Sequence, residues 1–139
     1  MRIGAWIERL KASSGLDIDA RGAASLARAQ AGHGRDTVYV VPLSENAPPS
    51  GVTGLTRQRA TVRVAAVIAV SNLRDESGAA AATELELVRD AVRAAWLGWQ
   101  PEGAGQPAEY RSGRLLTFAD RTVWWQDEYE TTYTITQER

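Results

Sequence analysis

The chain has 139 residues, of which 44% are apolar and 24% are charged, a composition typical of one globular domain with its own core. Its formal charge of −1 gives no net positive field that would hold nucleic acid. The absence of cysteine excludes disulfides, thiolate metal ligands and cysteine nucleophiles. The sequence therefore predicts a single domain over residues 1–139 that folds in a reducing compartment.

The N-terminal segment predicts a short amphipathic helix. Apolar residues recur every three or four positions from Ile3 to Leu10, with charged residues between them. Among these charges, Glu8 and Lys11 also interrupt any secretory signal sequence. No stretch approaches the ~18 apolar residues of a membrane helix. We therefore expect a soluble intracellular chain with no membrane segment.

Two strands are predicted before the middle of the chain. Residues 16–19 alternate apolar and acidic side chains, which indicates a short edge strand. An alanine-rich stretch over residues 23–30 predicts a second short helix. Thr37 to Leu43 is a second strand, in which Pro42 marks an edge or an end.

The stretch from Gln58 to Ser71 predicts a long central strand. Its β-branched residues alternate strictly, and its second half is apolar on both faces. The turn-rich residues 44–56 separate it from the preceding strand. This arrangement predicts the tip of a long hairpin, and the arginine-rich start of the strand is expected to project beyond the body.

The longest predicted helix covers residues 80–98. Thr83 and Glu86 have the spacing of a capping box, and Gly98 is expected to end the helix. The predicted core stripe consists of Leu85, Val88, Val92, Ala95 and Trp96.

A Gly/Pro-rich loop over residues 100–109 leads to a predicted antiparallel hairpin. Its strands are Arg114 to Phe118 and Val123 to Thr136. In the second strand, Asp127 falls on the otherwise apolar face, so either a bulge shifts the register or the carboxylate has a buried partner. Together the segments predict an α+β fold: a mixed or antiparallel sheet with a long central strand and helices packed on one side.

Residues suited to catalysis or metal binding do not form a motif. The only histidine, His33, stands between two glycines with no second metal-type residue at a useful spacing, and Ser112 has no histidine nearby in the sequence. A metal site built from Asp127, Glu128 and Glu130 would need carboxylates on one face, whereas strand alternation separates them. No catalytic, cofactor-binding or metal-binding residue is therefore predicted.

Arginine and tryptophan side chains are the candidate interface residues. Arg57, Arg59 and Arg63 share one strand face, which is either solvated or in contact with an acidic partner such as another copy of the chain. DNA binding through this patch is disfavoured by the net charge. Trp99 follows the long helix, and Trp124 lies on a polar strand face, either at an interface or packed under a neighbouring loop. We expect Trp124→Ala or Arg59→Glu to disturb assembly more than folding.

Five segments from about residue 36 onward stand in a distinctive order. They are Val38–Ser44, Val62–Asp75, Ala95–Pro101, Ser112–Asp120 and Val123–Tyr129. In order and spacing they resemble the tail terminator proteins of long-tailed bacteriophages and related prophages, with a looser match in the N-terminal helices.

The resemblance implies a structural virion protein with no catalytic residues and no cofactor. Members of this family form a hexameric ring on the neck end of the tail tube, which stops tube polymerisation and meets the head-to-tail connector. The implied partners are further copies of the chain, the tube protein and the connector, assembled in the host cytoplasm. DNA passes through the channel without specific binding, so we expect no continuous arginine belt there.

Two alternatives remain open from the sequence. The first is another head-tail joining or neck protein of similar size. The second is a small prophage-encoded enzyme or nucleic-acid-binding module.

Overall fold

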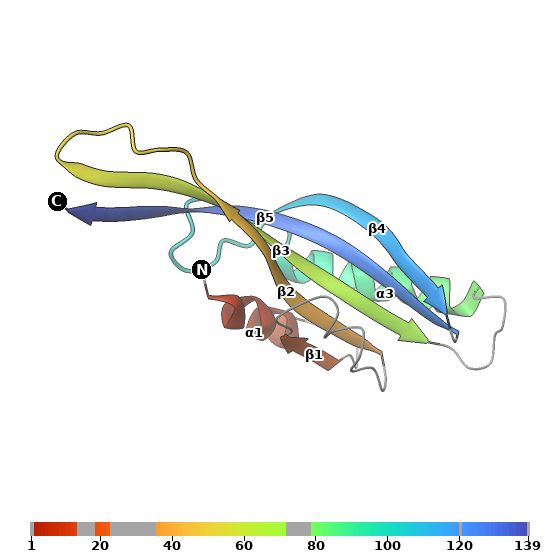
Figure 1. Cartoon of the computed structure of the whole chain (residues 1–139). Coiled ribbons are helices and arrows are strands. Elements are labelled where there is room, and N and C mark those ends of the chain that lie inside the picture. Colours follow the sequence, from red (N-terminus) through yellow and green to blue (C-terminus); the bar gives the residue numbers. More distant parts are fainter. Residues whose placement is uncertain (1, 14–18, 23–35, 72–78, 120, 139) are drawn as a thin grey trace.

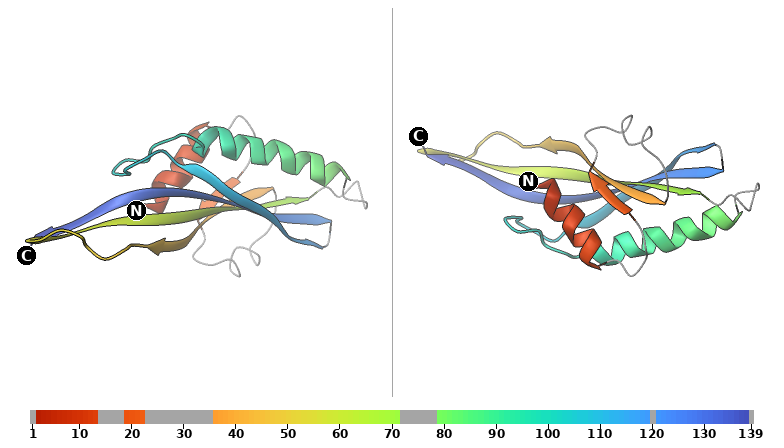
Figure 2. Two further views of the ribbon diagram at one scale, coloured as in Figure 1. Left: turned by 90° about the horizontal axis from the view of Figure 1, so that it is seen from above. Right: turned by 90° about the horizontal axis from the view of Figure 1, so that it is seen from below.

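The computed structural model describes residues 2–13, 19–22, 36–71, 79–119 and 121–138. Within these ranges, five strands form one mixed sheet in the order β1-β2-β3-β5-β4. Two helices pack on the same face of the sheet (Figures 1 and 2), which confirms the predicted α+β fold with helices on one side. The elements are α1 (Ile3–Ser13), β1 (Asp19–Gly22), β2 (Thr37–Asn46), β3 (Leu55–Ser71), α3 (Ala79–Trp96), β4 (Glu109–Ala119) and β5 (Thr122–Glu138).

The predicted central strand is β3. It pairs with β2 on one side and with β5 on the other, and it begins at Leu55, three residues before the predicted start. Its burial alternates up to Arg63 and becomes continuous from Val64 to Val70. The strand is therefore half-exposed where it leaves the body and covered on both faces inside it, as the change in its apolar pattern predicts.

Beyond the two helices, β2, β3 and β5 continue as a projecting arm, formed by residues 44–59 and 134–138 (Figure 1). The long hairpin predicted around residues 44–56 is confirmed, because β2 and β3 pair antiparallel on either side of it. β2 runs to Asn46, beyond the predicted end at Leu43, with a register shift between Pro42 and Ser44. The pairing of β2 with β1 ends at Val40, two residues before Pro42, so Pro42 lies where β2 has become an edge strand.

The main core lies between the sheet and the helices. Trp6 of α1 meets Trp96 of α3 edge to face at 5.1 Å, and the indole N–H of Trp96 donates to the Trp6 carbonyl at 3.1 Å. Tyr129 of β5 packs edge to face on the other side of Trp96 at 5.4 Å. These aromatic contacts hold α1 and α3 to each other and to the centre of the sheet.

Helix α3 buries all five residues of its predicted apolar stripe. Gly98 adopts φ 79°, the left-handed conformation expected of a residue that ends a helix. The predicted capping box is wrong, because α3 begins at Ala79 and Thr83 lies one turn inside it. The Thr83 hydroxyl instead donates back to the carbonyl of Ala79 at 3.3 Å.

The first strand of the sheet is parallel to its neighbour. β1 pairs with β2 from Asp19↔Thr37 to Gly22↔Val40 and forms one edge, as predicted for a strand carrying outward charge. Of the predicted strand over residues 16–19, only Asp19 is described, and residues 16–18 lie outside the described ranges. The helix predicted over residues 23–30 and His33 also lie outside them.

The C-terminal hairpin is longer than predicted at both ends. β4 begins at Glu109 and β5 continues to Glu138. The loop between α3 and β4 lies beside β5 ahead of β4, where Ala104 forms an isolated antiparallel β-bridge with Tyr133. No helix in the described part of the chain is long and apolar enough to cross a membrane.

Candidate functional site

The most strongly buried charge in the described ranges is Asp127, whose side chain is 1% exposed. β5 turns it toward the helices, where Arg89 of α3 approaches both carboxylate oxygens, Nε to Oδ2 at 3.0 Å and Nη2 to Oδ1 at 3.1 Å. Pairing with β3 runs through Asp127 without a shift. Of the two alternatives predicted for Asp127, the buried partner is therefore confirmed, and β5 has no bulge there relative to β3.

Two further donors complete the cluster around this carboxylate. The Trp125 indole N–H donates to Oδ1 of Asp127 at 2.8 Å, and the Tyr110 hydroxyl lies 3.4 Å from the same oxygen. The Arg89 guanidinium also lies over the Trp125 ring, 4.6 Å from its centroid. The Asp127 carboxylate raises the pKa of Arg89, chiefly by accepting its hydrogen bonds.

Gly113 of β4 closes the cluster from the side. A Cβ at this position would come within 2.5 Å of Asp127 Oδ1 and within 2.6 Å of the Tyr110 hydroxyl. Only glycine leaves room for the strand to pass so close to the buried carboxylate. The cluster braces α3 against β4 and β5.

Tyr129 lies beside this cluster and is fully buried. Burial, with a smaller effect from the negative charge of Asp127, raises the pKa of Tyr129 to about 12. Below about pH 10, tyrosine is neutral in the folded and unfolded states, so stability is fully present. Between about pH 10 and 12 the unfolded state loses the proton more readily, and we expect the free energy of unfolding to fall by roughly 2–3 kcal/mol.

Urea unfolding at a series of pH values from 8 to 12 measures this loss. Tyr129→Phe should flatten the decline, because phenylalanine has no proton to lose. Burial also raises the pKa of Tyr133, so a smaller decline should remain in that variant. An unchanged slope in Tyr129→Phe would contradict the assignment.

The other two carboxylates of the predicted acidic group lie on the opposite, outer face of the sheet. Glu130 stands between two arginines, with Arg63 Nε 3.3 Å from Oε1 and Arg111 Nε 3.7 Å from Oε2. The structure thus separates Asp127 from Glu128 and Glu130, as strand alternation predicts. No three His, Cys, Asp or Glu residues in the described ranges are grouped so that they could hold a metal ion.

The three candidate arginines have different surroundings. Arg63 is half-buried and already pairs with Glu130. Arg59 is exposed on the arm, and its Nη2 donates to Oε1 of Gln106 at 2.9 Å. Arg57 is exposed, and its backbone N–H donates to the hydroxyl of Ser50 at 3.0 Å. Of the three arginines, Arg57 and Arg59 therefore have exposed side chains on the arm.

Trp99 is half-buried beside the end of α3. It meets Trp6 edge to face at 5.2 Å, and the Arg9 guanidinium lies 5.6 Å from its ring centroid. These contacts join α1 to the loop that follows α3. A role for Trp99 at an interface stays a prediction.

Trp124, for which the sequence left an interface position and packing under a loop open, is buried against another strand of the sheet. Only 7% of its surface is accessible, and it stacks nearly parallel on Tyr39 of β2, with ring centroids 6.3 Å apart. It belongs to a second apolar cluster on the outer face of the sheet, which sequence alternation alone could not distinguish from a solvated face. Its role in assembly stays a prediction. The cluster consists of Tyr39, Val41, Ala65, Val67, Ala69 and Trp124.

A surface that sequence reasoning missed runs along α3. Glu86, Leu87, Asp90, Ala94 and Leu97 are all exposed and share one side of the helix, which we call the acidic stripe. Leu87 is 48% exposed and Leu97 49% exposed. The sequence could have indicated this surface, because both leucines lie outside the predicted core stripe and are therefore expected on the exposed side of the helix.

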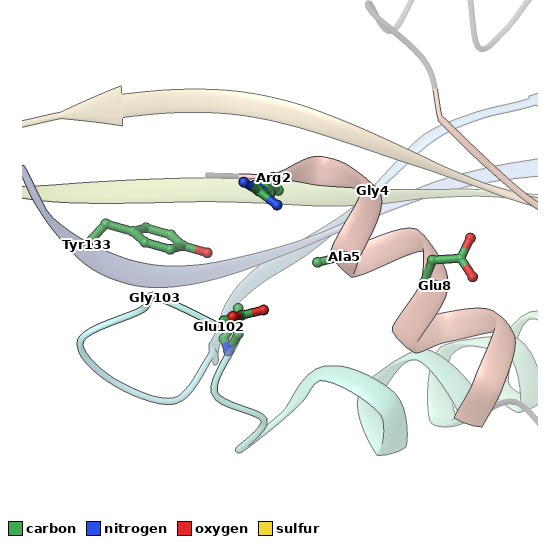
Figure 3. Close-up of a pocket in the computed structure, with 8 residues that line it drawn as sticks. Arg2, Gly4, Ala5, Glu8, Glu102, Gly103 and Tyr133 are labelled. Atoms are coloured by element: carbon green, nitrogen blue, oxygen red, sulfur yellow. The ribbon is translucent and has the colours of Figure 1, made fainter.

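A cleft of about 560 Å³ opens where the arm leaves the body. The cleft is lined by Arg2 and Glu8 of the N-terminal segment, Glu102 of the loop after α3 and Tyr133 of β5 (Figure 3). The lining combines one basic and two acidic side chains with a tyrosine, and it holds no histidine, serine or cysteine. The lining therefore lacks the serine–histidine and cysteine–histidine pairs of the common hydrolases.

The family model described as "Phage tail terminator protein" matches residues 1–139. No curated protein matches the chain.

Proposed function

The chain belongs to the phage tail terminator family, and from this membership we propose that six copies form a ring that caps the tail tube. Its broad role, a structural component of the phage tail, follows directly from the family. In the proposal, the ring stops tube polymerisation and joins the tube to the head-tail connector at the neck end of the virion tail. Assembly takes place in the host cytoplasm from this chain, the tube protein and the connector.

The family match over residues 1–139 carries the proposal, and the shape of the subunit supports it. A closed ring needs two different surfaces on each subunit that fit together on rotation. The arm projects past both helices and offers one surface, while the body offers another (Figure 2). A protein that acted as a lone globule would gain nothing from extending three strands into solvent.

The charges of the arm also suit a ring around passing DNA. The arm that carries Arg57 and Arg59 also carries the exposed acidic residues Glu45 and Glu138. Mixed charge of this kind would not retain DNA as a continuous arginine belt would. In the proposal, DNA therefore passes through the channel without specific binding.

The family is one of structural proteins, which argues against the alternative of a small prophage enzyme. The alternative of another head-tail joining protein predicts a different phenotype, so it can be separated by experiment.

Loss of the gene is expected to give overlong or headless tails in lysates, because nothing would stop the tube from growing. Electron microscopy of those lysates, with the gene supplied from a plasmid as the control, measures tail length directly. Light scattering of the purified protein should show a species of six times the 15.1 kDa of one chain. Tails of normal length that lack heads would instead identify a neck protein.

A further inference from the structure

Arg57 and Arg59 lie on the outer face of the arm. The register places them on the same side of β3 as Arg63, Ala65 and Val67, which belong to the outer face. Within the described residues the Arg57 guanidinium has no ion-pair partner, and Arg59 contacts only a neutral amide. The arm therefore presents two exposed arginines that form no ion pair within the described residues.

The acidic stripe of α3 presents the opposite charge. Glu86 and Asp90 are both exposed, and neither has an ion-pair partner within the described ranges. Leu87 and Leu97 lie beside them on the same side of the helix and are about half exposed. The stripe thus combines two free carboxylates with apolar surface, a combination suited to arginine, whose aliphatic stem packs while its charged end pairs.

The spacing of the two pairs matches. Residues two apart on a strand are separated by roughly 6.6 Å, so Arg57 and Arg59 stand at that distance. Residues four apart on a helix are separated by about 6 Å along the axis, which applies to Glu86 and Asp90. An arm lying along the helix could therefore bring each guanidinium to one carboxylate.

The two surfaces cannot meet within one chain. α3 packs on the face of the sheet that carries Val64 and Ala66 (Figure 2). The strand register places Arg57 and Arg59 on the opposite, outer face. Only the α3 of another molecule can reach the outer face of the arm. The contact would join two different patches, which is the type that closes into a ring.

We propose that the arm of each subunit lies along the acidic stripe of the next copy of this chain, where Arg57 and Arg59 pair with Glu86 and Asp90. The contact rests on the proposed ring and assigns its subunit interface. Arg59 can keep its hydrogen bond to Gln106, because a guanidinium has five N–H donors. Leu87 of the neighbour, next to Glu86, is covered by the stems of the arginines.

Charge reversal on each surface tests the contact. The arm variant carries Arg57→Glu and Arg59→Glu, and the helix variant carries Glu86→Arg and Asp90→Arg. We expect each variant alone to lose the hexamer in light scattering and to fail to restore tail length in a gene-deleted phage. All four positions are exposed, so thermal unfolding of the monomers should be nearly unchanged.

Mixing the two variants provides the decisive measurement. A reversed arm then faces a reversed helix, and a native arm faces a native helix, so alternating hexamers should form. Co-expression of both variants should likewise restore tails of normal length. A matched control reverses exposed charges elsewhere, Lys11→Glu with Arg114→Glu, and should leave hexamers and tails intact.

Hexamers or normal tails formed by either reversed variant alone would overturn the contact while leaving the proposed ring in place. Loss of assembly that the mixture does not restore would also overturn it. Normal tails in the gene-deleted phage itself would instead remove the proposed function.

Discussion

Replacing Asp127 with alanine is expected to lower the free energy of unfolding by about 3–5 kcal/mol, the usual cost of removing one partner from a buried ion pair. The Arg89 guanidinium would lose both of its carboxylate contacts while α3 still holds it against the sheet. The N–H of Trp125 would lose its acceptor as well. Three elements, α3, β4 and β5, would therefore lose a common attachment.

Urea unfolding of the monomer, followed by tryptophan fluorescence, measures this change. Glu138→Ala is the matched control, because it removes an exposed carboxylate from the same strand, β5. The control should change the free energy of unfolding by less than about 1 kcal/mol. A similar small change in Asp127→Ala would show that the buried pair does not hold α3 in place.

The second large effect is expected for Trp124→Ala, which should lower the free energy of unfolding by about 3–5 kcal/mol, as for other buried aromatic residues. The ring is 7% exposed and stacks on Tyr39, so truncation leaves a cavity between β2 and β5 on the outer face. Neighbouring Val67 and Ala69 are too short to fill it. From the sequence alone, Trp124→Ala was expected to disturb assembly more than folding. The burial of the ring now leads us to expect a large loss of folding stability as well.

Denaturant unfolding of monomeric Trp124→Ala and light scattering of the same variant separate folding from assembly. Arg57→Glu is the contrasting variant, since its exposed side chain should affect assembly and leave folding intact. If Trp124→Ala kept its full stability and lost the hexamer, Trp124 would be an interface residue and its burial in the cluster would contribute little.

The faces of β5 were predictable because strand alternation is a local geometric rule. It placed Trp124 with Glu128 and Glu130, and Asp127 with Trp125, and the register with β3 bears out both assignments. The rule does not say what covers a face. Tyr39 comes from a strand more than eighty residues away in the sequence, and only the pairing of β2 and β5 with β3 brings it beside Trp124.

The partner of Asp127 was beyond the sequence for a similar reason. The pattern showed that the carboxylate had to be paired or displaced by a bulge, but Arg89 lies 38 positions earlier, on the exposed border of a helix stripe. The predicted start of the long helix was also approximate. A threonine such as Thr83 has a side chain suited to capping a helix, but the sequence does not show whether it stands at the start or inside. The start of α3 at Ala79 made it an interior residue.

By itself, the sequence determined the elements that depend on short-range periodicity: the central strand β3, the buried stripe of α3 and the alternation of β5. It also carried the order of segments that resembles the tail terminator family. Only the tertiary structure decided which charges are buried, which aromatic rings are covered and which side chains remain on the arm and the acidic stripe. Those outcomes depend on contacts between strands and helices far apart in the chain, which no local pattern encodes.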